Sequence, residues 1–191
     1  MNLFGIRKSP IASPAHFQTM YERHRLAVFR YIYGLTAGPQ EEAEDLTAET
    51  FLRAWKARHR FEGDLDSAIG WLLRIAKRLV IDGYRRSRHT TPDLPSSDLQ
   101  AEATPEQIAL QDEQKNILHT LMADLPSEQR EILSLRYMLG WRVSEIANYI
   151  GATENNVSVM IHRTLSRLRE KWLDDDAETM SAVFVVKEKI S

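Results

Sequence analysis

The residues best suited to chemistry lie between Trp141 and Trp172, where amides and arginines follow a glycine turn. Ile146 and Ile150 predict an apolar face on a first helix. Gly151 supplies the positive φ angle that ends a helix sharply. The pattern predicts two helices joined by a tight turn, which is the arrangement of a helix-turn-helix.

The second of these helices is expected to begin after Thr153, which can cap it. Its apolar residues recur at helical spacing and are expected to face inward: Val157, Ile161, Leu165, Leu168 and Trp172. Amides near the start of such a helix suit base edges in the major groove, and cations further along suit phosphates. The candidate DNA contacts are Thr153, Glu154, Asn155, Asn156, Ser158, His162, Arg163 and Arg167. The alternative is an ordinary helical hairpin with a solvated charged face.

A second group of chemically suited residues lies on a helix predicted over 67–88, which combines aromatic with cationic residues. Its members are Trp71, Arg74, Lys77, Arg78, Asp82, Tyr84, Arg85 and Arg86. Aromatic rings can stack on unpaired bases and cations can follow a phosphate backbone, so this group suits an opened duplex. Asp82 is expected to orient the neighbouring arginines. The alternative places Trp71 in the core and leaves the cations solvated.

A helix predicted over 40–60 has two unlike faces. Leu46, Phe51 and Trp55 can pack inward, whereas the charged residues Glu42, Asp45, Glu49 and Arg53 recur at intervals of three and four on another side. Such a face is usually only solvated, and binding to a protein partner is the alternative.

Composition restricts the class of protein. The 191 residues include no cysteine, so disulfides, thiolate zinc sites and cysteine nucleophiles are excluded. We find no apolar run long enough to span a bilayer and no signal-peptide pattern, so we expect a cytoplasmic protein without membrane insertion. The six histidines are scattered, and neither a phosphate loop nor a nucleophile–base pattern is present. We therefore expect no metal, cofactor, small-molecule substrate or catalysis.

Charge is segregated along the chain, although the net charge is only −2. Basic residues dominate 71–90, and acidic residues dominate 91–116. A polyanion responds to such local fields more than to the total charge.

The expected fold is all-α, with two small helical domains joined by a flexible acidic linker and a helix-turn-helix in the second. The expected segments are an N-terminal extension over 1–14, a first domain over 15–89, a linker over 90–107, a second domain over 108–172 and a tail over 173–191. The linker contains prolines, serines and acids but few large apolar residues, so it cannot bury enough surface to fold alone.

Both helical units and their order resemble the extracytoplasmic-function (ECF) group of bacterial RNA polymerase sigma factors. The resemblance rests on the runs EEAEDLTAETFLRAW at 41–55, WLLRIAKRLVIDGYRR at 71–86 and LPSEQRE at 125–131, together with the helix-turn-helix. It implies a subunit that binds core RNA polymerase and recognises the −10 and −35 elements of promoter DNA. The implied polymerase contacts are Glu42, Asp45, Leu46, Glu49, Leu52 and Arg53, facing the β′ clamp helices.

The same resemblance implies that the 67–88 helix melts and reads the −10 element, that the 61–70 loop shapes a pocket for a displaced base, and that the second domain reads the −35 element. It also implies contact with the polymerase β flap and control by an anti-sigma factor. The linker is expected either to occupy the polymerase RNA channel or to act as a passive tether. The tail can dock a partner or remain a loosely ordered end.

The chain departs from the usual family pattern at five positions. Ala48 stands where Gln is usual and Arg78 where Asn is usual, while Ser158 and Met160 replace basic residues. Arg142 replaces the Ser or Thr cap before the helix-turn-helix, which we expect to cost around 1 kcal/mol of local stability. Two other functions remain as alternatives: a stand-alone helix-turn-helix regulator, which would normally dimerise, and an adaptor that does not bind DNA.

Overall fold

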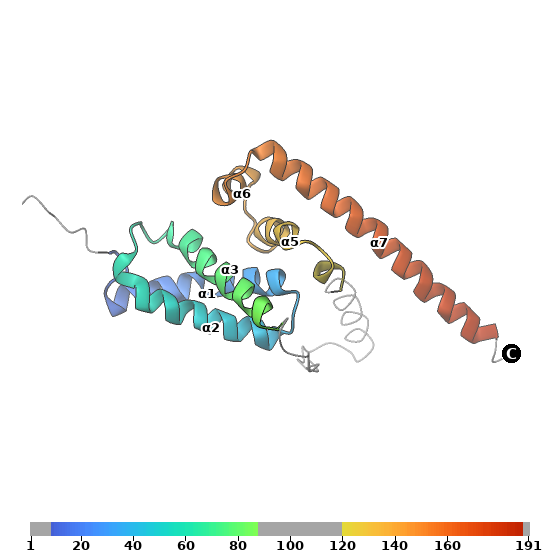
Figure 1. The fold of residues 1–191 in the computed structure, drawn as a ribbon, viewed down its shortest axis with the longest axis horizontal. Helices are drawn as coiled ribbons and strands as arrows, with labels where there is room; N and C mark the ends of the chain where they lie inside the picture. The colour runs from blue at the N-terminus through green and yellow to red at the C-terminus, as the bar shows by residue number, and fades with distance from the viewer. Residues whose placement is uncertain (1–8, 88–119, 189–191) are drawn as a thin grey trace, which may run out of the picture. The chain divides into compact units, whose positions relative to one another are not determined.

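The computed structural model describes residues 9–87 and 120–188, with side chains up to Arg85 in the first range and up to Trp172 in the second. The described chain is helical and divides into two compact units (Figure 1). The first contains α1 (Pro14–Thr36), α2 (Gln40–Ala57), the short 3₁₀ helix η1 (Arg58–Arg60) and α3 (Ala68–Ser87). The second contains α5 (Ser127–Leu133), the π-helical turn η2 (Ser134–Met138), α6 (Val143–Ile150) and α7 (Glu154–Glu188). The all-α prediction is confirmed, and the predicted linker lies outside the described residues.

In the first unit, α1, α2 and α3 each pack against the other two. The buried residues recur every three or four positions, because one side of each helix faces the core. The principal core residues are Met20, Val28, Tyr31, Ile32, Ala43, Phe51, Ala54, Leu72, Leu73, Ala76, Leu79 and Val80. Two edge-to-face aromatic pairs connect α1 to α2: Phe17 with Trp55, and Tyr21 with Phe51. The helix boundaries expected at Gln40 and near Ser67 agree with the structure to within a residue.

The segment before α1 belongs to this core, although the sequence suggested a simple extension. Ile11 is fully buried, and Ser13 caps α1 by accepting a hydrogen bond from the His16 backbone. Arg58 holds the segment in place: its Nε donates to the Ala12 carbonyl at 3.1 Å, and its guanidinium lies 3.5 Å from the centre of the Trp55 ring. A short apolar segment of this kind has no periodicity to reveal it, so the sequence pattern missed it.

In the second unit, α7 packs against both α5 and α6. The core is formed by Leu121, Leu125, Ile132, Leu133, Leu135, Ile146, Ala147 and Val157. One expected inward residue of α7 is wrong: Leu165 is 37% exposed, whereas the adjacent Thr164 is 2% exposed. Thr164 fits the buried position because its hydroxyl donates to the Met160 carbonyl at 2.7 Å within the helix.

Polar side chains of α5 and α7 also contact the segment that precedes α5, at Ala123 and Asp124. Arg130 is buried, and its Nη1 donates to the Ala123 carbonyl at 3.1 Å. Lys171 on α7 pairs with Asp124 at 2.8 Å, and this contact lowers the pKa of the Asp124 carboxyl. The π-helical turn η2 was not predicted, and no residue pattern in the sequence indicates it.

The turn between α6 and α7 has the predicted geometry. Gly151 adopts a φ of 75°, and its N–H donates to the Ala147 carbonyl at 2.9 Å. Thr153 then caps α7 by accepting from the Asn156 N–H at 3.2 Å. The helix-turn-helix is therefore built by local chemistry that the sequence alone identifies.

The start of α6 has half of a capping box. The Glu145 carboxylate accepts from the Arg142 backbone N–H at 2.6 Å. An arginine side chain has no acceptor, so it cannot return the other bond to the first turn of the helix. The weak cap expected at Arg142 agrees with this geometry. Glu145 compensates for part of the missing capping interaction by accepting from the Arg142 backbone N–H.

The helix α7 is longer than expected. It continues to Glu188, whereas the sequence predicted an end near Trp172 followed by a tail.

Replacing Gly151 with Ala should lower the free energy of unfolding by about 1 kcal/mol, because the φ angle of 75° is unfavourable for any residue with a Cβ. Gly83 is the matched control, since it lies inside α3 with open space around its missing Cβ and no positive φ. Gly83→Ala should raise stability by roughly 0.5–1 kcal/mol. Urea unfolding followed by circular dichroism measures both, and equal shifts of the same sign would contradict the assigned turn.

Replacing Arg142 with Ser should stabilise the second unit by about 1 kcal/mol, since the hydroxyl would accept the bond that Arg142 cannot. Thermal unfolding of the full chain measures the gain. In the Glu145→Ala background the box cannot be completed on the other side, so the two substitutions should be non-additive. Strict additivity would show that the two residues do not act as one cap.

Candidate nucleic-acid and polymerase interfaces

The exposed side of α3 presents a basic stripe, which we define as Arg74, Arg78 and Arg85 together with Asp82. All four residues are exposed and recur at intervals of three or four, opposite the buried face of α3. Ile81, which is 39% exposed, adds an apolar residue beside the stripe. The structure thus brings these predicted residues together on one face. Lys77 is half-buried, and the side chain of Arg86 lies outside the described part of the chain.

Trp71 combines the two roles that the sequence left open. It is half-buried, and its ring lies 4.9 Å from the ring of the buried Phe61 at a tilt of 40°. One part of the indole supports the α2–α3 loop, and the remaining part is accessible.

Tyr84 is held by a contact that the sequence did not indicate. Its hydroxyl donates to the Thr36 carbonyl at 2.5 Å, which ties α3 to the end of α1. Its ring is 41% exposed. The ring therefore remains available to a base, whereas the hydroxyl is engaged within the fold.

The loop between α2 and α3 spans 61–67, because α3 begins at Ala68 and includes the last three residues of the loop expected over 61–70. Hydrogen bonds within the loop define its conformation. The Asp64 carboxylate accepts from the Ser67 N–H at 2.7 Å, and the Ser67 hydroxyl accepts from the Asp64 N–H at 3.0 Å. These hydrogen bonds with Ser67 lower the pKa of the Asp64 carboxyl. Side chains of α1 hold the loop from outside: His24 Nε2 lies 2.9 Å from the Leu65 carbonyl, and Arg23 forms an ion pair with Asp66. Sequence reasoning identified the loop but missed both α1 residues, because contacts across 40 residues leave no local pattern.

The side of α2 opposite the core forms an acidic face, which we define as Glu42, Asp45, Glu49, Leu52 and Arg53. Glu49 is half-buried and the other four residues are exposed. Arg53 pairs with Glu49 at 2.7 Å, so the net negative charge is concentrated at Glu42 and Asp45. Leu52 is 47% exposed in the middle of these charges.

The side chains of Leu46 and Glu42 on α2 are both partly buried. Leu46 is half-buried, which agrees with both its inward packing and a part in the acidic face. The carboxyl of Glu42 lies next to Gly38, and partial burial of that group raises its pKa although the residue as a whole is exposed.

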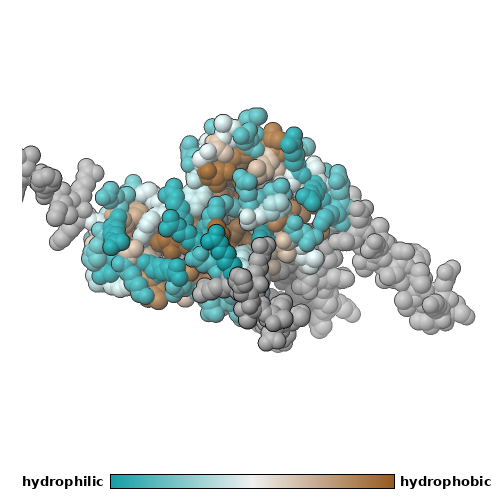
Figure 2. All heavy atoms as spheres, viewed as in Figure 1, coloured by the Kyte–Doolittle hydropathy of each residue, from teal (hydrophilic) through white to brown (hydrophobic). Residues whose placement is uncertain are grey.

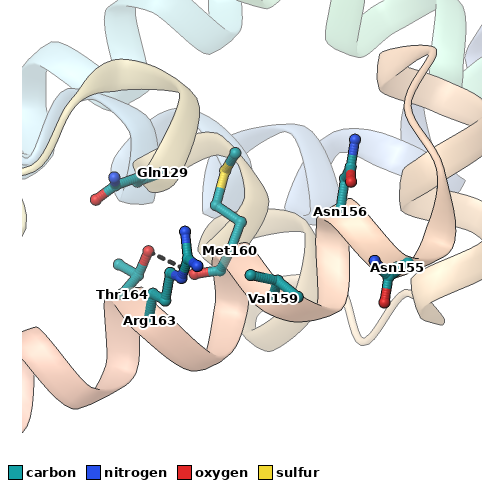
Figure 3. Close-up of a pocket in the computed structure, with 7 residues that line it drawn as sticks. All are labelled: Gln129, Asn155, Asn156, Val159, Met160, Arg163 and Thr164. Atoms are coloured by element: carbon teal, nitrogen blue, oxygen red, sulfur yellow. Dashed lines mark hydrogen bonds between the residues drawn. The ribbon is translucent and has the colours of Figure 1, made fainter.

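The start of α7 exposes all of the predicted DNA contacts: Thr153, Glu154, Asn155, Asn156, Ser158, His162, Arg163 and Arg167. A hollow of about 560 Å³ lies between α5 and α7 (Figure 3). It is lined by Gln129, Asn155, Asn156, Val159, Met160, Arg163 and Thr164. The hollow combines amide groups and one cation with two apolar side chains. Sequence reasoning missed Gln129 and Val159, because the hollow forms only when α5 packs against α7.

The surface is consistent with these assignments. In the view of Figure 2, hydrophilic residues cover most of the described part of each unit, and hydrophobic residues show in small areas between them. Over residues 9–87 and 120–188 there is no helix long and apolar enough to cross a membrane. The described residues also contain no group of three or more His, Asp or Glu side chains that could hold a metal ion.

Comparison with known proteins agrees with the order of the two units. The family model for sigma-70 region 2 matches residues 20–90, and the model for sigma-70 region 4 matches residues 115–168. Together they cover well over half of the 191 residues. The chain is 29% identical over 161 residues to the ECF RNA polymerase sigma factor SigL of Mycobacterium tuberculosis, covering 83% of this chain and 89% of SigL.

Two solved structures share the fold. CnrH in complex with the cytosolic domain of CnrY matches with a TM-score of 0.62 and 22% identity, covering 88% of this chain and 94% of CnrH. The sigma factor RpoE of Bartonella quintana, solved with the anti-sigma factor NepR, matches with a TM-score of 0.60 and 22% identity, covering 81% of this chain and 94% of RpoE. The two family models and the similarity to SigL show that the chain belongs to the ECF group of sigma-70 factors, which direct transcription initiation by RNA polymerase.

Proposed function

We propose that three described faces divide the work of this sigma factor. The acidic face of α2 binds core RNA polymerase, the basic stripe of α3 with the 61–67 loop handles the −10 element, and the start of α7 reads the −35 element. In this proposal residues 15–89 form sigma region 2, residues 108–172 form sigma region 4, and residues 90–107 link them. The observation that carries the proposal is that each face lies opposite a completed core, so its charged residues are not needed for folding.

The polymerase contact is supported by the character of the α2 face. Asp45 and Glu49 place carboxylates around the exposed Leu52. Charge complementarity sets the register and the association rate of such a contact, and the apolar side chain adds buried area. We assign this face to the β′ clamp helices of the polymerase.

The −10 contact is supported by the combination of cations with accessible aromatic surface on α3. Arg74, Arg78 and Arg85 can follow a phosphate backbone. The accessible parts of Trp71 and Tyr84 can replace stacking that bases lose when the duplex opens. Stacking of this kind is worth about 1–3 kcal/mol per base.

The −35 contact is supported by the polarity of α7. Asn155 and Asn156 are exposed in its first turn, where amides can reach base edges. Arg163 and Arg167 are exposed about two and three turns later, where cations can reach phosphates. We also assign to this unit the contact with the polymerase β flap.

We further propose control by an anti-sigma factor in the cytoplasm, where RNA polymerase acts. The support is that RpoE, which shares this fold, was solved with its anti-sigma factor NepR. A protein that covers the acidic face of α2 would compete directly with polymerase.

Asp45→Arg should abolish holoenzyme assembly without unfolding the protein, because the side chain is exposed and opposite the core. We expect at least a tenfold loss of affinity for core polymerase and a change of less than about 0.5 kcal/mol in the free energy of unfolding. Glu49→Lys should act in the same direction.

Glu44→Lys is the matched control for this reversal. Glu44 is exposed on the same helix and undergoes the same change of sign as Glu49, but it lies about 100° around the helix from Asp45. Its variant should assemble normally. Binding of fluorescently labelled variants to core polymerase provides the measurement, and unchanged assembly by Asp45→Arg would refute the assignment.

Arg85→Ala should reduce the salt dependence of promoter binding. Each lost phosphate contact lowers the slope of log K against log salt concentration by roughly 0.9 for duplex DNA. Arg25→Ala is the control, because Arg25 is also an exposed arginine but lies on α1, outside the stripe. Filter binding or fluorescence anisotropy of the holoenzyme over a salt series measures the slope. Identical slopes for both variants would remove Arg85 from the DNA interface.

A further inference from the structure

Within the described residues, the loop between α2 and α3 is held from outside by two adjacent residues of α1. The His24 ring is buried, at 7% exposure, and its Nε2 lies 2.9 Å from the Leu65 carbonyl oxygen. A carbonyl can only accept, so Nε2 carries the proton and donates it. The neighbouring Arg23 forms an ion pair with Asp66 at the surface. Two consecutive residues of α1, Arg23 and His24, therefore contact two consecutive residues of the loop, Asp66 and Leu65.

Internal contacts keep the loop in one conformation. Asp64 and Ser67 exchange hydrogen bonds in both directions, and the Ser67 hydroxyl also donates to the Asp64 carbonyl at 3.0 Å. Gly63 lies against the Phe61 ring, where an added Cβ would come within 2.8 Å of ring carbon Cζ. These contacts fix the shape of the loop from within. Its position therefore depends on what holds it from outside.

His24 is the buried part of that outside contact, and the ion pair is the exposed part. The exposed pair is accessible to water and salt, so it contributes little. The histidine bond goes to a backbone carbonyl, so it does not depend on which side chain occupies position 65. The side chain at position 65 can therefore change without loss of this hydrogen bond.

We propose that His24 is a positioning residue for the capture of a displaced −10 base, acting through the backbone of Leu65. This inference rests on the function proposed above for the 61–67 loop. The hydrogen bond sets the distance between the loop and the accessible part of Trp71, and these two elements form the sides of the base pocket. His24 itself does not contact DNA.

The test uses the complete holoenzyme and single-stranded oligonucleotides of the non-template −10 strand, taken from a promoter mapped after overexpression. Each base of the strand is replaced in turn by an abasic site, and the loss of affinity at each position is measured. In the wild type, one position should show a large loss, which marks the pocket. His24→Leu should reduce that loss by roughly five-fold, as expected for one hydrogen bond, and should leave the other positions unchanged.

His24→Gln is the conservative control. The glutamine amide nitrogen is the same number of bonds from Cα as the histidine Nε2 and can donate to the same carbonyl. It should restore most of the base-specific loss. A residue that only stabilised the fold would change binding equally at every position, and its effect would follow thermal stability.

The possible outcomes are distinct. A base-specific defect in His24→Leu, with recovery in His24→Gln, supports the proposal. A folded His24→Leu variant with the wild-type abasic profile overturns it. If His24→Leu does not fold, His24→Asn should reduce the loss at the same position, because its amide is one bond shorter than that of glutamine and cannot reach the Leu65 carbonyl. An unchanged profile in that variant then overturns the proposal. If no position of the wild-type profile stands out, the proposed function of the loop is wrong, and this inference falls with it.

Discussion

The whole structure depends on each helix burying one side only. In α3, Leu72, Leu73, Ala76, Leu79 and Val80 complete the core of the first unit. The helical repeat then requires Arg74, Arg78 and Arg85 to point away from that core. The same constraint separates Phe51 and Ala54 from Asp45 and Leu52 on α2, and Val157 from Asn155 and Asn156 on α7. An exposed face can therefore change its chemistry while the core remains intact.

A few hydrogen bonds from side chains to backbone carbonyls then set where these faces lie. Tyr84 ties α3 to the end of α1, Arg58 ties the segment before α1 to α2, and His24 ties the α2–α3 loop to α1. Each of these hydrogen bonds joins residues that are more than 40 positions apart in the sequence, and each has a backbone carbonyl as its acceptor. Because a carbonyl is present at every position, the partner residue is free to vary. Such contacts give a small helical unit, which has little buried area, a definite arrangement of its surface.

The sequence predicted what depends on local chemistry. The boundaries of α2 and α3, the Gly151 turn and the Thr153 cap all follow from spacing and capping residues, and the resemblance to sigma factors rested on the same segments. The sequence pattern did not predict features that depend on how the helices pack against one another. Thr164 instead of Leu165 faces the core, and its hydroxyl is satisfied within α7. Ile11 is buried in a segment that Arg58 holds through the Ala12 carbonyl. The hollow beside Gln129 needs two helices to meet. Periodicity contains no information about contacts of this kind.

The central claim is that this chain gives core polymerase a promoter specificity that it lacks alone. Run-off transcription with purified core polymerase tests it most directly, on templates bearing promoters mapped after overexpression. Adding the protein should produce transcripts that start at the mapped positions, and changing either the −10 or the −35 element should abolish them. The account would be contradicted if a well-folded protein produced no new transcript, or if transcripts were indifferent to both elements.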